Sequence, residues 1–334
     1  MKVIVVGIAN QRTTLPIGAF PVTRGAGPSY HHEIRYSVGG IAFAVARSLA
    51  ALGNEVDLAA PLGEDYPTSL IDNEAYRFDL STHLCTRTLA RTPRSVVLYA
   101  EDGTRQVFND LTDASRASFR LSDLQPDIAD ADITILASRR MTAPLAAELA
   151  DAGLPFAVDL HEIGPHILDD APGEPSEEFA QWVAPFLAAR YLTMSAERVP
   201  GREQAALTAL AHASRAELVI MTLGCRGCLL LVRQPDGSWP AEPVHVPASP
   251  VRITNTIGAG DAFFAVFLHE LLTCRADPIT AASRANTAVA RLLAAEPAHG
   301  GIGVDRLAEL LGPACAPRVD PTAVLQADPT IVEA

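Results

Sequence analysis

The pattern of apolar and polar positions becomes regular from about residue 130 onward. Short apolar runs, the length of buried strands, alternate there with longer segments of helical periodicity. The pattern predicts strands over 133–137, 156–160, 191–194 and 218–223, and helices over 143–152, 177–189 and 202–213. Strands that alternate with helices are typical of a parallel, doubly wound sheet.

The first ninety residues add to the same sheet. The β-branched run Val3–Val6 is closed by Gly7, and 56–60 forms a second strand. Between them, Gly39 and Gly40 precede an alanine-rich helical stretch that Gly53 ends.

Two segments, 11–37 and 91–111, do not follow the alternation of strands and helices. Strands over 94–100 and 105–108 flank an Asp102-Gly103 turn, which predicts a β-hairpin. We expect the two segments to pair as a separate small sheet. The fold class is therefore α/β, with a doubly wound, mostly parallel sheet and a small β-sheet.

The end of the chain contains two further strands and two long helices. The pattern predicts strands over 228–233 and 242–247 and helices over 261–274 and 278–295. From about residue 316 the apolar periodicity stops and prolines recur at 317, 321 and 329, which indicates a loosely structured tail.

Composition and charge limit the function classes. Apolar residues make up 49% of the 334-residue chain, enough for a large core, and the net charge is −13. An acidic balance argues against a nucleic-acid or anionic-membrane surface. No apolar run reaches the ~18 residues of a membrane span, and the first residues do not read as a signal peptide. These features predict a cytoplasmic protein with a small-molecule substrate.

One residue type is nearly absent. Lys2 is the only lysine in the chain. This excludes a P-loop lysine, a protein-kinase strand lysine and a pyridoxal-phosphate lysine downstream of the first strand. Any phosphate chemistry must use backbone amides, helix dipoles, arginine and metal ions.

The strongest motif is Asn255-Thr256-Ile257-Gly258-Ala259-Gly260-Asp261, which runs directly into an apolar helix. Its glycines allow a tight turn, and the free amides and dipole of the helix form an anion site. Asp261 lies in the first helical turn beside that site. A carboxylate beside an anion site is what phosphoryl transfer needs, because the amides hold the phosphoryl group while the carboxylate takes the hydroxyl proton.

Two weaker motifs support this one. Thr222-Leu223-Gly224-Cys225-Arg226-Gly227 follows a strand and suits a surface that lies against a nucleotide, and Gly39-Gly40 opens a helix. Each alone is an ordinary turn. In this order and spacing, the three together make the chain resemble the ribokinase-like (PfkB) carbohydrate kinase family over roughly residues 1–312.

The resemblance implies a domain plan. Residues 1–10, 38–90 and 112–315 would form the nucleotide-binding α/β core, and 11–37 with 91–111 a β lid over the substrate site, with 316–334 as the tail. It also implies a possible homodimer through the lid.

The resemblance further implies ATP, Mg²⁺ and possibly a monovalent cation (K⁺) as cofactors. Asp261 would be the base and the amides of Gly258, Ala259 and Gly260 the anion hole. Carbonyls near 253–257 and 294–303 would bind the monovalent cation. The implied ATP contacts are Thr222, Gly224, Arg226, Gly227, Thr256 and Asn286, and the implied substrate contacts are Asn10, Arg12, Gly39, Gly40, Ala44, Arg140 and Asp261.

Departures from the family pattern concern mainly the substrate end. Arg12 and Ala44 stand where family sugar kinases often have an Asp and an Asn that bind sugar hydroxyls, and Arg139-Arg140 stands where an acid is common. Asn255 replaces the Asp that usually opens the glycine motif, which predicts weak or absent K⁺ activation. The metal-associated NxxE motif matches Ser195–Arg198, so its acid is missing or displaced to Glu197, the candidate metal ligand.

Asp159 ends a core strand at the carboxyl edge of the sheet, where such folds bind ligands, and it is either a site residue or a structural cap.

The leading hypothesis is an ATP-dependent kinase that phosphorylates a hydroxyl of a sugar or sugar-derived metabolite. The alternatives are a nucleoside kinase of the same fold and a non-catalytic metabolite-binding homologue. A dinucleotide dehydrogenase is disfavoured, because Gly7-Ile8-Ala9-Asn10 is not the GxGxxG fingerprint. Because guanidinium only donates hydrogen bonds, the arginines predict an acidic sugar, a sugar phosphate or a bulkier nucleoside-like molecule rather than a plain neutral sugar.

Overall fold

An eight-stranded sheet forms the centre of the computed structural model, which describes residues 1–22, 34–100, 104–161, 183–251, 256–295, 304 and 307–311. The strand order is β14-β13-β12-β11-β10-β9-β1-β4. The strands from β12 to β4 run parallel, and β13 and β14 are antiparallel additions at one edge. The strands are β1 (Lys2–Val6), β4 (Glu55–Ala59), β9 (Ile133–Ala137), β10 (Phe156–Asp159), β11 (Tyr191–Ser195), β12 (Leu218–Thr222), β13 (Cys228–Val232) and β14 (Val244–Val246).

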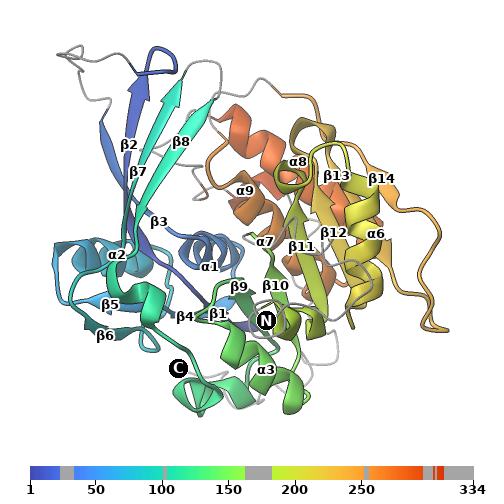
Figure 1. The fold of residues 1–334 in the computed structure, drawn as a ribbon, viewed down its shortest axis with the longest axis horizontal. Coiled ribbons are helices and arrows are strands. Elements are labelled where there is room, and N and C mark those ends of the chain that lie inside the picture. Colours follow the sequence, from blue (N-terminus) through green and yellow to red (C-terminus); the bar gives the residue numbers. More distant parts are fainter. Residues whose placement is uncertain are drawn as a thin grey trace, which may run out of the picture.

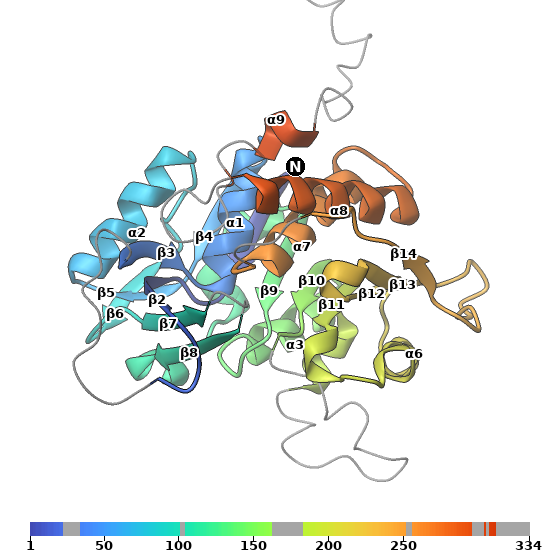
Figure 2. The ribbon, with the colours of Figure 1, turned by 90° about the horizontal axis from the view of Figure 1, so that it is seen from above.

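Helices cover both faces of this sheet, as Figure 2 shows from above. On one side lie α1 (Ile41–Ala51), α7 (Ala259–Leu272), α8 (Pro278–Ala294) and α9 (Leu307–Leu311). On the other lie α3 (Ala143–Asp151) and α6 (Glu203–Ala213). The predicted α/β class with a mostly parallel sheet is confirmed.

Strand β1 shows why the sheet is buried on both faces. Val3 and Val5 point into the core beneath α1 and α7, whereas Ile4 and Val6 point into the core beneath α3 and α6. Side chains alternate along a strand, so only a continuous apolar run can fill both cores.

A second, four-stranded sheet has the order β3-β2-β7-β8 and stands beside the central sheet (Figure 1). We call it the small sheet. Its strands are β2 (Asn10–Ile17), β3 (Arg35–Gly39), β7 (Arg94–Ala100) and β8 (Arg105–Asp110). The predicted pairing of the two irregular segments is confirmed, and β2 pairs with β7 in parallel.

The register of the small sheet sorts its side chains into two faces. Arg12 on β2 lies opposite Ser37 on β3 and Ser95 on β7. Ser95, Val97 and Tyr99 are alternate residues of β7, and Tyr99 pairs with Arg105 on β8. Because alternate residues share a face, Arg12 and Arg105 lie on the same side. Arg105 bonds to residues of the central domain, so this is the inner face of the small sheet.

Three parts of the predicted secondary structure were wrong or missing. The helix predicted over 177–189 is, in its described part, only the 3-10 turn Ala184–Ala188. Helix α7 begins at Ala259, two residues before the predicted start at 261, because Gly258 caps it. The pattern also missed α2 (Tyr66–Arg77) and the short strands β5 (Pro61–Gly63) and β6 (Thr86–Leu89). Helix α2 was missed because its buried positions are few and its exposed face contains Tyr66 and Tyr76.

The Asp102-Gly103 turn and the 316–334 tail lie outside the described residues. Within the described residues, no helix is long and apolar enough to span a membrane.

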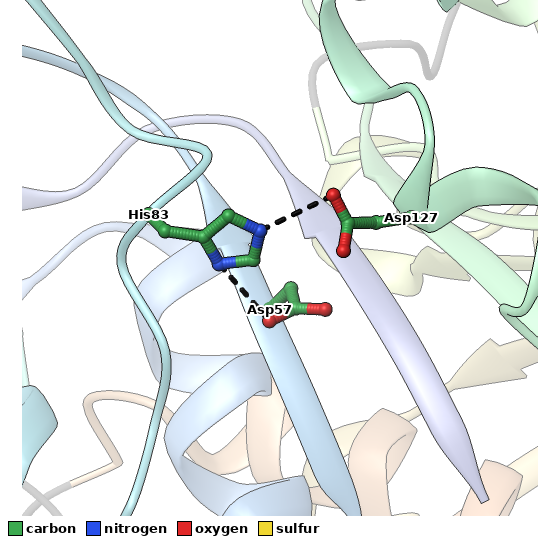
Figure 3. A group of neighbouring side chains, drawn as sticks. All are labelled: Asp57, His83 and Asp127. Atoms are coloured by element: carbon green, nitrogen blue, oxygen red, sulfur yellow. Dashed lines mark ion pairs between the residues drawn. The ribbon is translucent and has the colours of Figure 1, made fainter.

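One group of potential metal ligands occurs at the edge of the central sheet, within the described part of the chain: Asp57, His83 and Asp127 (Figure 3). His83 Nδ1 lies 3.5 Å from Asp57 Oδ1, and His83 Nε2 lies 3.2 Å from Asp127 Oδ2. The two carboxylates therefore face opposite nitrogens of one ring. One metal ion cannot use both nitrogens of an imidazole, so this arrangement fits a histidine that links strand β4 to the turn Asp127–Ala129 better than a metal site.

We expect His83→Gln to lower the melting temperature slightly, by less than about 3 °C, because exposed ion pairs contribute little. The hydrogen bond from His83 lowers the pKa of Asp127, so this contribution is present above the ordinary aspartate pKa and is lost as pH falls through the lowered one. Thermal scans should therefore show the largest difference near pH ~5, where a histidine is charged and an aspartate ionised. His212→Gln, on the exposed end of α6, is the control, and an equal or larger effect at pH ~9 would contradict the ion-pair interpretation.

Candidate active site

The predicted site residues gather at the carboxyl edge of the parallel strands. Asp159 ends β10, Ser195 ends β11 and Thr222 ends β12. The N-terminus of α7 meets the same edge, since the charge of Asp261 acts on Asp159. This is the edge at which open α/β sheets bind their ligands.

The start of α7 provides an open anion cradle. Gly258 caps the helix in the left-handed region (φ 88°), and a Cβ built there would meet only Asp261 Oδ2, at 4.0 Å. A Cβ on Gly260 would meet nothing within 4 Å. In the described part of the chain, the N–H groups of Gly260 and Asp261 donate to no backbone carbonyl. Free amides at the positive end of a 14-residue helix fit a phosphoryl group.

Asp261 has the electrostatic setting of a general base. Loss of solvent raises the pKa of its carboxyl to about 6, although the charges of Arg12, Arg47 and Arg105 each lower it. At neutral pH the carboxylate is therefore ionised and more basic than an ordinary aspartate. A base whose pKa lies near the working pH is the most effective at accepting a hydroxyl proton.

Asp159 is a second carboxyl in the same place. Loss of solvent, and then the charge of Asp261, raises the pKa of Asp159 to about 8. The structure thus places Asp159 within electrostatic reach of the predicted base. Asp159 fits a divalent cation, because Mg²⁺ takes oxygen ligands and its charge would favour the ionised form of a carboxyl whose pKa is raised.

Arg105 joins the small sheet to this site and was missed by the sequence analysis. From the start of β8, its Nη1 donates to Thr256 Oγ1 at 2.8 Å, and its Nη2 lies 3.4 Å from both oxygens of Glu197. Glu197, the candidate metal ligand, is largely exposed and occupied by this ion pair. The alternation of residues along the predicted hairpin could have placed Arg105 on the inner face of the small sheet. Its partners could not be predicted in this way, because Glu197 and Thr256 lie 92 and 151 positions away in the sequence.

The predicted nucleotide side forms a closely packed surface. Gly227 (φ 94°) lies so near the next strand that a Cβ would be 2.1 Å from Val246 O, whereas a Cβ on Gly224 would meet nothing. Asn286 Nδ2 donates to the carbonyls of Val246 (3.1 Å) and Pro247 (3.2 Å), which fixes this segment against α8.

Two other predicted ATP contacts are engaged elsewhere. Arg226 pairs with Glu203 at 2.8 Å, and Thr222 Oγ1 donates weakly to Met194 O at 3.5 Å.

The predicted acceptor side lies where β2, β3 and α1 meet. A Cβ on Gly39 would be 2.6 Å from Asn10 Oδ1 and 2.7 Å from Arg12 Nε, so both side chains lie flat against this glycine. Gly40 caps α1 with φ 94°, and a Cβ there would be 2.2 Å from Ile8 O. Glycine is therefore required at position 40, whereas a side chain at position 39 would displace Asn10 and Arg12.

The other two residues predicted to contact the substrate, Ala44 and Arg140, differ in how buried they are. Ala44 is buried in the first turns of α1 and bonds to Gly40 O through its N–H. Arg140 is exposed on the turn after β9.

Further arginines surround the site although the chain is acidic overall. Loss of solvent, and then the charges of Arg198, Arg139 and Arg105, lowers the pKa of His161 to about 4. His161 is the second residue after β10, and its lowered pKa makes it neutral at physiological pH. Positive charges therefore act at this edge of the sheet beside the carboxyls of Asp159 and Asp261.

Comparisons with solved structures identify this architecture. A microbiome-derived acarbose kinase superposes with a TM-score of 0.74 at 20% identity, covering 93% of this chain and 98% of that one. Ribokinase from Arabidopsis thaliana, complexed with ribose and ATP, superposes with a TM-score of 0.70 at 19% identity and covers 93% and 98%. The chain has the ribokinase fold. Ribokinase from Thermotoga maritima gives a TM-score of 0.68 at 19% identity over 92% and 98%.

A family comparison agrees with the ribokinase fold. Residues 166–298 match the sequence model of the pfkB family carbohydrate kinases, a region that contains both the 222–227 turn and the glycine motif. The predicted PfkB resemblance is confirmed. A search of curated proteins finds no significant match.

Asn255 and most of the segments predicted to bind a monovalent cation lie outside the described residues.

Proposed function

We propose that this ribokinase-fold protein transfers a phosphoryl group from ATP to a hydroxyl of a sugar or sugar-derived metabolite. The observation that supports this most is the juxtaposition of Asp261 with the open cradle of Gly258, Gly260 and the free amides of α7. The base takes the proton of the attacking hydroxyl, and the amides hold the phosphoryl group as its charge develops.

The proposal that ATP is the phosphoryl donor rests on solved structures of the same fold as well as on the site. Structures of the same fold bear ATP, including the Arabidopsis ribokinase and a sugar kinase from Pyrococcus horikoshii with 19% identity and a TM-score of 0.64. In this chain the Gly224–Gly227 turn, Thr256 and the segment anchored by Asn286 would border the phosphates of bound ATP.

The positive charge that neutralises the phosphates of ATP must come from arginine side chains or a metal ion, because no lysine lies near the site. Lys2 lies at the opposite end of β1 from the site, where it pairs with Glu55 at 3.8 Å. Bound Mg²⁺ would supply the charge that neutralises the phosphates. Asp159, with the predicted ligand Glu197, would hold it, and Asp261 would stay free to accept the hydroxyl proton.

We expect Asp159→Asn to raise the Mg²⁺ concentration needed for half-maximal activity by at least about tenfold, since a carboxylate is lost from the cation site. The same change should raise the melting temperature of the metal-free protein at neutral pH. The pKa of Asp159 is raised to about 8, so its burial costs stability above the ordinary aspartate pKa, and an amide avoids that cost. Mg²⁺ titrations and thermal scans check both parts. An unchanged Mg²⁺ requirement would contradict the assignment.

The proposed activity is tested by measuring ATP consumption by the full chain with Mg²⁺ and a panel of sugars, sugar acids, sugar phosphates and nucleosides. A hydroxyl compound that increases ATP consumption well above the rate in water supports the proposal. Preference for nucleosides would favour the nucleoside-kinase alternative. Binding without consumption would favour the non-catalytic homologue, although an intact Gly258-Ala259-Gly260-Asp261 gives little support to that alternative. The homodimer expected from the resemblance stays a prediction.

A further inference from the structure

Arg12 is an unusual charged residue. It is partly buried on the inner face of the small sheet, and the structure gives it no hydrogen bond and no ion pair within the described residues. A partly buried charge without a partner is costly, and it persists where a ligand supplies the opposite charge.

The neighbouring charges do not neutralise Arg12. Loss of solvent lowers the pKa of its guanidinium, and Arg47 and Arg105 lower it further, while only Asp261 opposes them. Arg47 has Glu74 at 3.4 Å and stacks near Phe78, and Arg105 has Glu197. Asp261 forms no ion pair with Arg12, and its carboxylate is required for the hydroxyl proton.

The position of Arg12 assigns it to the acceptor rather than to ATP. It lies against Gly39, next to Asn10, on the strands of the predicted acceptor side, whereas Thr256 and the Gly224–Gly227 turn belong to the predicted nucleotide side. Asn10 is 5% exposed; its Nδ2 donates to Ser95 Oγ at 3.1 Å, and its Oδ1 has no partner. A buried acceptor without a donor is a place for a hydroxyl group.

We propose that the phosphate acceptor is a polyol with an anionic group, a carboxylate or a phosphate ester, and that Arg12 binds this group while Asn10 Oδ1 accepts a neighbouring hydroxyl. The proposal rests on the proposed kinase function and names its substrate class. A guanidinium forms two parallel hydrogen bonds with either anion, and glycine at position 39 leaves the space for its planar face.

The test compares pairs of probes in which one member has an anionic group that the other lacks. D-gluconate is compared with D-glucitol for the carboxylate, and D-fructose 6-phosphate with D-fructose for the phosphate ester. Binding is measured by calorimetry and thermal shift without ATP, and turnover by ATP consumption. Charge-assisted hydrogen bonds contribute enough to expect at least one anionic probe to bind about tenfold to a hundredfold tighter than its neutral counterpart.

Variants then locate the effect. Arg12→Gln should abolish the preference for the anion with little change for the neutral partner, and Arg12→Lys should retain part of it. Gln11→Ala, the next residue on β2 and on the opposite face of the small sheet, is the matched control and should leave the preference intact.

Equal or tighter binding of both neutral probes by the unaltered protein would overturn the proposal. So would an Arg12→Gln variant that weakens neutral and anionic probes equally, since that is the result of a purely structural role. The binding measurements, which are made without ATP, do not depend on turnover. If an anionic probe binds through Arg12 but no compound consumes ATP, the proposed kinase function fails while the acid-binding site stands.

Discussion

Asp261→Asn should lower kcat by about 10²–10⁴-fold, the usual contribution of a general base, while ATP affinity changes little and the melting temperature at neutral pH does not fall, because the raised pKa of Asp261 means that its ionised form costs stability. The amide keeps the shape of the side chain, its place in the first turn of α7 and the free N–H groups beside it. It cannot accept the hydroxyl proton. Steady-state kinetics and ATP binding by calorimetry measure the two parts, and a loss below about tenfold would exclude the assignment.

The pH profile of the unaltered protein gives an independent check. Because burial raises the pKa of Asp261 to about 6, the ionised base is lost as pH falls through that value. We expect kcat/KM to fall about tenfold for each pH unit below it, with the decline starting closer to neutrality than for an ordinary aspartate. An unchanged rate down to pH ~4.5 would show that the reaction does not depend on this carboxylate.

Gly258→Ala should lower kcat by about 10²-fold or more, because a methyl group there would keep the phosphoryl group away from the N–H donors of α7, an effect comparable to removing a donor from an anion hole. The added methyl group would lie 4.0 Å from Asp261 Oδ2, in the open space where the phosphoryl group would lie. Replacing glycine at φ 88° also strains the backbone, by about 1–2 kcal/mol. Steady-state kinetics measures the activity, and chemical denaturation measures the free energy of unfolding.

Gly53→Ala is the matched control for this prediction. Gly53 ends α1 at φ 77°, and a Cβ there would also meet nothing within 4 Å. The two variants should lose similar stability, but only Gly258→Ala should lose activity. Equal activity in the two variants would show that the start of α7 does not hold the phosphoryl group.

Local sequence patterns predicted the central sheet well because each of its strands is a separate apolar run. Val3–Val6 and 133–137 appear as continuous β-branched or aliphatic stretches, and they form β1 and β9. Helix α2 was not predicted, since only four of its twelve residues are buried and the apolar stripe is weak. The sequence analysis placed the start of α7 two residues too late. In the structure Gly258 adopts the left-handed conformation and caps the helix, so that the helix begins at Ala259.

The candidate site was predicted unevenly for a similar reason. The glycine motif, its helix and Asp261 are contiguous in sequence, so their spacing defines the geometry. Arg105 was missed because its contacts with Glu197 and Thr256 depend on how the small sheet packs on the central one. That Arg12 has no hydrogen-bond or ion-pair partner among the described residues is likewise a property of packing, which the sequence does not show.

The most direct measurement of the central claim follows the terminal phosphoryl group of ATP itself. The full chain and its Asp261→Asn variant are incubated with Mg²⁺, terminally labelled ATP and the compound that best stimulates ATP consumption. The label should appear as a phosphate ester of that compound with the unaltered protein and be reduced at least about a hundredfold with the variant, which still binds ATP. Label that appears only as inorganic phosphate, or an ester formed equally fast by the variant, would contradict phosphoryl transfer to a hydroxyl through Asp261.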